Sequence, residues 1–341
     1  MKIDRRGFVR LAAAAASAVA GSAVNGFKAA GGTTARLIDV HHHVFPEPLA
    51  SVLRTYWPAN SLPGLDRSMQ ELSAGGTSFA MMSYPNYDIL SFDKARLSGL
   101  IHETNSAAKD LIRPNLQRYG LFASLPLPFV DSALEEITYC YDKLETDGIL
   151  LLSSYNDKWL GDASFAPVLD ELNRRKAVVF VHPAASTCCR GLVPGLSDSV
   201  IEYETDTART LASLLFSGTA ERCPDIRFIF SHAGGSMPSL IERFTTATQP
   251  SPAVAKNIPK GALAYLRAFH YDTAQAVNPT ALGALLRIVE PSQVLFGTDF
   301  PYRHAPDQVA ALRGLHLPAT TLTAILAGNA ERLIPRSAAG R

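Results

Sequence analysis

The sequence contains little cysteine, no long basic run and no strongly apolar stretch of membrane-spanning length. Four cysteines in 341 residues do not make a disulfide framework, and no two of them have zinc-ribbon spacing. A net charge of +1 with 18% charged residues gives no electrostatic footprint for nucleic acid. Repeats and low-complexity tracts are missing outside an N-terminal alanine stretch. These absences exclude a disulfide-rich scaffold, a nucleic-acid-binding protein and a repeat protein.

Eight segments of the chain have the length and apolar character of buried strands, and helical patterns fill most gaps between them. Such alternation implies parallel strands with right-handed crossovers. Apolar residues make up 47% of the chain, enough for a large core. We therefore predict an α/β protein with one (β/α)8 TIM-barrel domain over residues 36–335. The strand candidates lie near 36–43, 78–83, 120–125, 148–153, 177–182, 226–231, 268–273 and 293–298.

The connecting segments differ in character. Helical patterns cover residues 131–144, 165–175, 207–217 and 279–289. The segment 45–76, rich in proline and aromatic residues, is predicted to be the longest irregular insertion after a strand. Because loops after strands line the active face of a barrel, it is placed to cover the pocket. The segment 249–260 is predicted to be a solvent loop.

The N-terminus has the pattern of a targeting segment. Asp4-Arg5-Arg6-Gly7-Phe8-Val9-Arg10 resembles a twin-arginine signal, and the alanine-rich stretch 11–24 is short and weakly apolar for a membrane span. We predict that residues 1–30 are a removable signal read by the twin-arginine export machinery. The mature protein would then be periplasmic and would keep no membrane anchor. A surface amphipathic helix is the alternative.

Four strand candidates end in residues that ligate metals. The first ends in His41-His42-His43, and three later ones end at His182, His232 and Asp299. Because a parallel barrel gathers the C-terminal ends of its strands at one face, these side chains are expected to meet. Imidazole and carboxylate together suit zinc, and manganese or iron also fit. The pattern predicts a metal-centred active site.

The first strand can be divided into two faces. Side chains alternate along a strand, so Asp39, His41 and His43 are predicted to point one way. Two imidazoles at i and i+2 can chelate one ion, and Asp39 beneath them could orient a ligating ring. His42 is predicted to face the outer helices and not to be a ligand.

The remaining candidates have two interpretations each. His232, which precedes Ala233-Gly234-Gly235, is either a ligand or a group that handles protons near the metal. Asp272 is predicted to support the site or the fold. Arg209 is the best placed cation for a substrate carboxylate, although a helix-surface salt bridge explains it equally well. The adjacent Cys188 and Cys189 lie either near the pocket or in a plain loop. Cys140 is predicted to be a helix core residue. The other histidines are predicted to be structural or exposed: His102, His270, His304 and His316.

These motifs resemble the amidohydrolase superfamily, and within it the branch related to aminocarboxymuconate-semialdehyde decarboxylase. The resemblance covers residues 38–333 and rests on Ile38-Asp39-Val40-His41-His42-His43, Val181-His182-Pro183, Ser231-His232-Ala233-Gly234-Gly235 and Phe296-Gly297-Thr298-Asp299-Phe300-Pro301. It implies that His41, His43, His182 and Asp299 bind one divalent metal, zinc first and manganese second. His232 would be catalytic together with Asp299. The fourth strand ends Leu151-Leu152-Ser153-Ser154 without the lysine that bridges two metals in other members, which favours a mononuclear site.

Two further stretches, 155–182 and Asp206-Thr207-Ala208-Arg209-Thr210, resemble decarboxylases of salicylate-type acids such as 6-methylsalicylate. The implied activity is metal-dependent, non-oxidative decarboxylation of a small aromatic or enoic carboxylic acid. The same groups could instead activate a metal-bound hydroxide in a hydrolase of lactones or amides, or act in a hydratase. A non-catalytic protein that binds a metal or a ligand on the same barrel is the third hypothesis. We also expect a homodimer.

Overall fold

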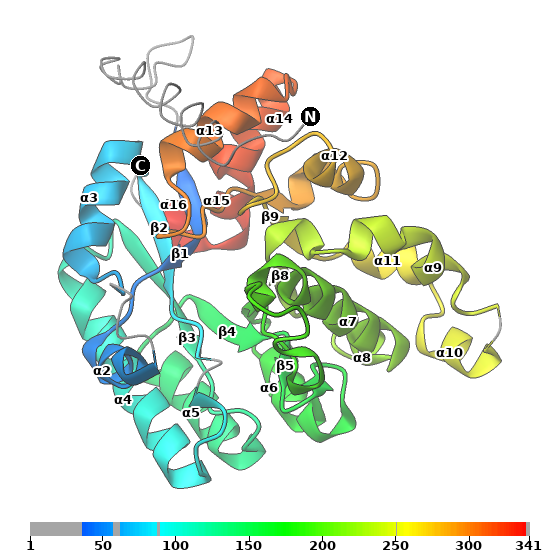
Figure 1. The fold of residues 1–341 in the computed structure, drawn as a ribbon, viewed down its shortest axis with the longest axis horizontal. Coiled ribbons are helices and arrows are strands. Elements are labelled where there is room, and N and C mark those ends of the chain that lie inside the picture. The colour runs from blue at the N-terminus through cyan, green and yellow to red at the C-terminus, as the bar shows by residue number, and fades with distance from the viewer. Residues whose placement is uncertain (1–35, 57–61, 87–88, 250, 339–341) are drawn as a thin grey trace, which may run out of the picture. The chain divides into compact units, whose positions relative to one another are not determined.

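Eight parallel strands form the central sheet of the barrel, and helices lie around it (Figure 1). The computed structural model describes residues 36–56, 62–86, 89–249 and 251–338. Strand order follows chain order, β1-β2-β3-β4-β7-β8-β9-β10, so the predicted (β/α)8 architecture is confirmed. The strands are β1 (Ile38–His43), β2 (Phe79–Ser83), β3 (Tyr119–Ser124), β4 (Gly148–Leu152), β7 (Val178–His182), β8 (Arg227–Phe230), β9 (His270–Asp272) and β10 (Val294–Leu295).

The barrel closes between the last strand and the first. Beyond β10 the chain continues alongside β1, where Val40 N donates to Phe296 O at 3.0 Å and His43 N donates to Phe300 O at 3.0 Å. His42 and Phe300 form a parallel bridge. The segment after β10 therefore completes the ring and brings its loop next to the histidines of β1.

The strands are apolar on both faces because helices cover one face and the barrel core lies against the other. In β4, for example, Ile149, Leu150, Leu151 and Leu152 are all fully buried. Gly148 begins this strand where a β-carbon would come within 2.5 Å of Val178 O, so only glycine fits against the neighbouring strand.

The longest helix, of 19 residues, follows β2, helices of 9 to 15 residues follow β1, β3, β4, β7 and β10, and pieces of 5 or 6 residues follow β8 and β9. The predicted helices over 131–144 and 165–175 are observed as α5 and α6, and the one over 207–217 begins earlier, as α7. The helices are α2 (Glu47–Tyr56), α3 (Leu65–Gly75), α4 (Lys94–Ile112), α5 (Val130–Asp142), α6 (Ala166–Arg174), α7 (Glu202–Phe216), α8 (Thr219–Arg222), α9 (Ile241–Thr246), α10 (Pro252–Asn257), α11 (Ala262–Leu266), α12 (Ala281–Leu285), α13 (Ala305–Gly314), α14 (Ala319–Thr323), α15 (Asn329–Leu333) and α16 (Pro335–Ala338).

Two predictions of irregular structure are wrong. The segment 45–76 contains the helices α2 and α3. In α2 a buried stripe of Leu49, Ala50 and Leu53 packs inward while Arg54 and Glu47 pair at 2.8 Å on the surface, so amphipathicity outweighs the proline content. The segment 249–260 contains α10, which starts at Pro252, a residue that favours the first turn of a helix.

A short hairpin that the sequence analysis did not predict follows β4. Its strands are β5 (Ser154–Tyr155) and β6 (Lys158–Trp159), and the two residues between them have φ of 50° and 60°, as a two-residue type I′ turn requires. Asp157 in this turn accepts hydrogen bonds from the hydroxyls of Ser186 and Thr187. The hairpin therefore holds the start of the loop that follows β7.

The structure places the cysteines, whereas the predicted N-terminal signal lies outside the residues that it describes. Cys140 is buried on α5, as predicted, and Cys223 is also buried. Cys188 and Cys189 form a disulfide between neighbouring residues in the loop after β7. The predicted signal over residues 1–30 lies outside the described residues. Within the described part of the chain, no helix combines the length and apolar character that crossing a bilayer requires.

Asp39 joins the first strand of the barrel to the segment after the last strand. It was predicted instead to orient a ligating ring. Its carboxylate accepts from the backbone N–H of His41 at 3.1 Å and of Thr298 at 3.0 Å, and from Thr298 Oγ1 at 2.6 Å. The ring of His42, not that of His41, contacts it, at 3.0 Å. The β1–β2 register shifts between Asp39 and His42, so the simple alternation of faces fails there.

His42 lies on the outer side of β1, as the sequence analysis predicted. Its Nε2 is 2.8 Å from Ser68 Oγ on α3, and Ser68 Oγ is 2.7 Å from Tyr119 Oη. The ring also stacks on Phe300 with centroids 4.5 Å apart. His42 therefore links the first strand to a helix and to the closing segment.

Replacing Asp39 with alanine should destabilise the barrel. The change leaves buried donors of His41, His42 and Thr298 without an acceptor, at a cost of about 1–3 kcal/mol each. We expect the free energy of unfolding to fall by about 3–5 kcal/mol, measured by urea denaturation. The exposed Asp225→Ala is the control and should leave the midpoint unchanged. Coincident curves for Asp39→Ala and the wild type would refute the role of Asp39.

Candidate metal centre

The C-terminal ends of three strand segments bring His41, His43, His182 and Asp299 to one point. One ligand atom from each of the four lies within 4.8 Å of all the others, and all four residues are buried. His41 Nε2 and His43 Nε2 are 3.2 Å apart. Asp299 Oδ1 lies 3.2 Å from the first nitrogen and 3.0 Å from the second. The structure thus brings together the whole predicted ligand set.

The donor set fits a divalent cation. Three imidazoles and one carboxylate suit zinc or another first-row divalent metal. Asp299 Oδ1 is buried and makes no hydrogen bond to the described residues, although a buried carboxylate oxygen is normally satisfied. A cation among these four residues would satisfy that oxygen.

The second nitrogen of each ligand imidazole is held by a separate partner. His41 Nδ1 lies 2.8 Å from Asp272 Oδ2, His43 Nδ1 lies 3.0 Å from Ser83 Oγ, and His182 Nδ1 donates to the Pro183 carbonyl at 2.8 Å. Such contacts fix the tautomer and direct Nε2 inward. The orienting role predicted for Asp39 therefore belongs to Asp272.

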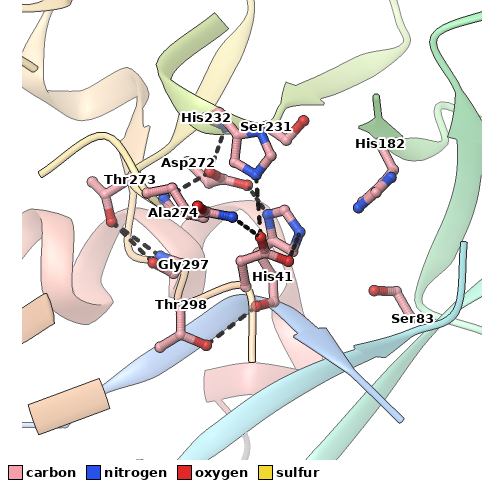
Figure 2. A network of polar contacts seen from close by, with 12 residues as sticks. His41, Ser83, His182, Ser231, His232, Asp272, Thr273, Ala274, Gly297 and Thr298 are labelled. Atoms are coloured by element: carbon pink, nitrogen blue, oxygen red, sulfur yellow. Dashed lines mark hydrogen bonds and ion pairs between the residues drawn. The ribbon is translucent and has the colours of Figure 1, made fainter. Parts of the chain in front are cut away.

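Asp272 connects several parts of the site, as Figure 2 shows. Besides contacting the His41 ring, it accepts through Oδ1 from the backbone N–H of His232 and of Ala274, each at 2.9 Å. Gly297 passes close by, where a β-carbon would lie 2.9 Å from His41 Cβ and 3.1 Å from Asp272 Cβ. Close packing of backbone and carboxylate therefore fixes the position of His41.

His232 lies beside the ligand cluster. Its Nε2 is 3.6 Å from Asp299 Oδ2, and its Nδ1 is 3.2 Å from Glu204 Oε1. Gln275 Nε2 donates to the same Asp299 oxygen. One oxygen of Asp299 thus faces the ligand histidines, while the other faces His232 and Gln275.

The backbone around the site is unusual. His232, Ala233, Gln275 and Asp299 all have positive φ, between 53° and 64°, a region that residues other than glycine rarely adopt. Such conformations cluster at functional sites because the surrounding structure must hold them. Sequence reasoning missed Glu204 and Gln275, since neither lies at the end of a predicted strand.

The electrostatics of the cluster divide its histidines into two groups. Burial lowers the pKa of His43, and it lowers that of His182 well below the usual value, which favours neutral, ligating rings. Burial would also lower the pKa of His41, but Asp272 and Asp299 raise it to about 9. Burial likewise opposes a charged His232, yet Asp299 and Glu204 raise its pKa well above the usual value. His232 is therefore set up as a proton donor.

Asp299 is the carboxylate at the centre of these interactions. Burial favours its neutral form, but His41 and the nearby rings of His232 and His43 hold its pKa well below the usual value. A carboxylate that stays ionised is the form that a metal requires.

A cavity of about 810 Å³ opens at the cluster. The lining residues come from the C-terminal ends of β1 and β7, from the segments after β1, β2, β7, β8, β9 and β10, and from the first turn of α7, so the cavity occupies the active face of a barrel. They include His43, His182, His232, Gln275 and Asp299, together with Phe45, Pro85, Ala185, Arg190, Ser197, Asp198, Ser199, Val200, Tyr203, Glu204, Tyr302 and Arg303.

The structure does not bring Arg209 to this cavity. It lies on α7, and its Nη1 is 3.9 Å from Glu202 and 4.0 Å from Asp206. These distances match the salt-bridge interpretation rather than the predicted contact with a substrate carboxylate. Arg190 and Arg303 are the arginines that line the cavity.

The end of β4 holds two serines where a dinuclear member of the superfamily would place its lysine. Ser153 and Ser154 both donate to Asp206, the latter at 2.8 Å. Trp159 Nε1 donates to the same carboxylate at 2.7 Å. This polar cluster fixes the β5–β6 hairpin against α7 and supplies no second metal ligand.

Comparison with known proteins identifies the family. Residues 38–336 match the amidohydrolase family model, and the chain belongs to this family. It is 32% identical over 315 residues to 6-methylsalicylic acid decarboxylase of Penicillium expansum, covering 88% of this chain and 96% of that one. It is 26% identical over 199 residues to 2-amino-3-carboxymuconate-6-semialdehyde decarboxylase of Dictyostelium discoideum, covering 58% and 55%.

A solved structure supports the same architecture. The fold matches 5-carboxyvanillate decarboxylase of Novosphingobium aromaticivorans, a structure in complex with manganese, with a TM-score of 0.82 and 18% identity, covering 92% of this chain and all of that one. The predicted resemblance to the superfamily and its decarboxylase branch is confirmed.

Replacing Asp272 with asparagine should weaken metal binding without removing a ligand. The amide keeps the size of the side chain but loses the charge that orients the His41 ring, and such partners are typically worth about 10–100-fold in metal affinity. We expect that loss in competition with a chromogenic chelator. The exposed Asp225→Asn is the matched control. Unchanged affinity in Asp272→Asn would show that His41 needs no orienting carboxylate.

Proposed function

We propose that this chain is a metal-dependent, non-oxidative decarboxylase of a small carboxylic acid of the salicylate type, such as 6-methylsalicylic acid. One observation carries the proposal: a buried cluster of three histidines and Asp299 lies beside His232 at the floor of a cavity. The relationship to 6-methylsalicylic acid decarboxylase over 88% of the chain favours this activity over hydrolysis of a lactone or amide.

We propose zinc as the metal, with manganese as the alternative, held by His41, His43, His182 and Asp299. When bound, a divalent cation supplies a Lewis acid and a template for the carboxylate or a neighbouring phenolic oxygen. Three imidazoles favour zinc. Manganese is bound in the related 5-carboxyvanillate decarboxylase structure, so both metals are worth testing.

The residues around the cluster suit the proton transfer that decarboxylation needs. Loss of carbon dioxide breaks a carbon–carbon bond and leaves its electron pair on the ring carbon, which must then take up a proton. Asp299 and Glu204 raise the pKa of His232 well above its usual value, and the side chain lines the cavity. It can donate that proton to the ring carbon and recover it from solvent. The buried surroundings strengthen this electrostatic assistance.

Elemental analysis of the purified protein should find one divalent ion per chain. His182→Ala removes a ligand from the set and should lose both metal and activity. His42→Ala is the control, because His42 contacts Asp39 and Ser68, and its metal content should stay nearly unchanged. Two ions per chain, or full occupancy in His182→Ala, would contradict the proposed site.

His232→Ala should keep its metal and lose turnover. Help from one general acid or base is typically worth about 10²–10⁴-fold. We therefore expect kcat for a salicylate-type acid to fall within or beyond that range. In heavy water the wild type should place one solvent deuterium on the carbon that lost its carboxyl group, read by mass spectrometry. Wild-type turnover in His232→Ala, at full metal content, would remove His232 from the mechanism.

We further propose that the protein is exported by the twin-arginine route to the periplasm, as the motif from Asp4 to Arg10 suggests. Replacing Arg5 and Arg6 with lysine should leave folded, metal-loaded, uncleaved protein in the cytoplasm, because the export machinery reads the arginine pair. Fractionation and intact-mass measurement test this. Processed protein recovered from the periplasm in the variant would mean that the segment is not such a signal. The homodimer likewise stays a prediction.

A further inference from the structure

The loop between β7 and α7 supplies more of the cavity wall than any other segment of the described chain. Ala185, Arg190 and residues 197–200 line the cavity from this loop, and Tyr203 and Glu204 follow in the first turn of α7. The shape of the cavity therefore depends on where this loop lies.

Little packing holds the outer part of the loop in place. Residues 190–200 are exposed apart from the half-buried Asp198. Among them are the apolar side chains of Leu192, Val193 and Val200, which are 63%, 49% and 58% exposed. A segment with few buried apolar contacts opens at little cost in free energy. Its position therefore depends on the restraints at its base, where the chain leaves β7.

Two restraints act at that base. The first is Asp157 at the tip of the β5–β6 hairpin, whose carboxylate accepts hydrogen bonds from the hydroxyls of Ser186 and Thr187 and from Cys188 N at 3.2 Å. The second is the disulfide between Cys188 and Cys189. Because this bond joins adjacent residues, it closes a small covalent ring that restricts the soft backbone dihedrals of both.

The disulfide is accessible to a reductant and directly adjoins the cavity wall. Cys188 is exposed and Cys189 is half-buried, whereas Cys140 and Cys223 are buried free thiols. Arg190, the next residue along the chain, lines the cavity. Exposed disulfides are more readily reduced than buried structural ones, and they are the regulatory kind. Reduction removes one of the two restraints on the loop.

We propose that the Cys188–Cys189 disulfide is a redox-sensitive latch on the cavity wall. In the oxidised form the loop after β7 is held as a wall of the cavity, and the cavity binds the substrate acid. In the dithiol form the loop is released, and the acid binds more weakly. This regulation rests on the proposed function, since that function places the acid in the cavity. An oxidising compartment such as the periplasm keeps such a bond intact.

A dithiol is the class of reductant that opens the latch. Its first thiolate attacks one cysteine sulfur, the S–S bond breaks, and the released cysteine thiolate takes up a proton. The second thiolate of the reductant then displaces the other cysteine, which is protonated in turn. Two electrons pass to the protein, which gains two cysteine thiols, and the reductant becomes a cyclic disulfide.

Counting thiols tests the bond itself. Protein purified in air is denatured without reductant and alkylated with iodoacetamide, and peptide mapping locates the label. We expect label on Cys140 and Cys223 alone, and on all four cysteines after treatment with dithiothreitol. Full labelling of Cys188 and Cys189 before reduction would overturn the latch.

Binding of benzoate, which lacks the phenolic hydroxyl of the proposed substrate, compares the two redox forms. Protein reduced with dithiothreitol is freed of the reagent under nitrogen, and elemental analysis checks that both forms hold the same metal. A wall that is in place only part of the time lowers the apparent affinity by that fraction. We expect calorimetry to give a Kd at least about 10-fold higher in the reduced form. Residues 186–200 should also exchange their amide hydrogens faster.

Two variants assign the effect to this pair of cysteines. Cys188→Ser/Cys189→Ser cannot form the bond and should bind benzoate like the reduced wild type, with or without dithiothreitol. Cys223→Ala removes a buried thiol outside the loop and should keep the full response. A reduced wild type that binds benzoate as tightly as the oxidised form, or a response that persists in the serine variant, would contradict the latch.

Turnover of 6-methylsalicylate separates this inference from the proposed function. We expect reduction to lower kcat/KM about 10-fold through KM. If neither redox form releases carbon dioxide but benzoate binding and hydrogen exchange respond to reduction, the decarboxylase proposal fails and the latch stands. If both forms release carbon dioxide with the same kcat/KM, the latch fails alone.

Discussion

The placement of Asp299 is the constraint on which both the barrel and the site depend. Its backbone N–H donates to His41 O at 2.8 Å, so the residue takes part in joining the last strand segment to the first. Its carboxylate lies 3.0–3.2 Å from the imidazoles of His41 and His43. The contacts that close the barrel between β1 and the segment after β10 therefore also position the ligand cluster. A change that weakens these contacts should also disturb the metal site.

The supporting residues make that constraint rigid. Asp39 accepts hydrogen bonds from the backbone of β1 and of the segment after β10. Asp272 contacts the His41 ring and accepts from the backbone N–H of His232. Gln275 fixes the second oxygen of Asp299. Positive φ at His232 and Asp299 indicates that the surrounding contacts hold the chain in conformations that it would otherwise avoid. These contacts leave little conformational freedom to the proposed metal ligands and to His232, the proposed proton donor.

The sequence predicted much of this arrangement because apolar runs that end in His or Asp report directly on strand ends. The meeting of His41, His43, His182 and Asp299 follows from that pattern, and all eight strands follow from the alternation of apolar runs with helical patterns. The exchange of roles between Asp39 and Asp272 did not, since it arises from a register shift in β1. Arg209 was predicted to meet a substrate carboxylate, but it lies on α7 beside Glu202 and Asp206 and is not among the residues that line the cavity.

The most direct test follows the fate of the carboxyl carbon. Protein stripped by a chelator should be inert toward 6-methylsalicylate labelled at that carbon, and one equivalent of zinc or manganese should restore turnover. The label should then appear as carbon dioxide in a 1:1 ratio with the decarboxylated phenol, as breaking one carbon–carbon bond requires. Turnover of the stripped protein, or opening of lactones with no labelled gas from any hydroxybenzoate, would contradict the account.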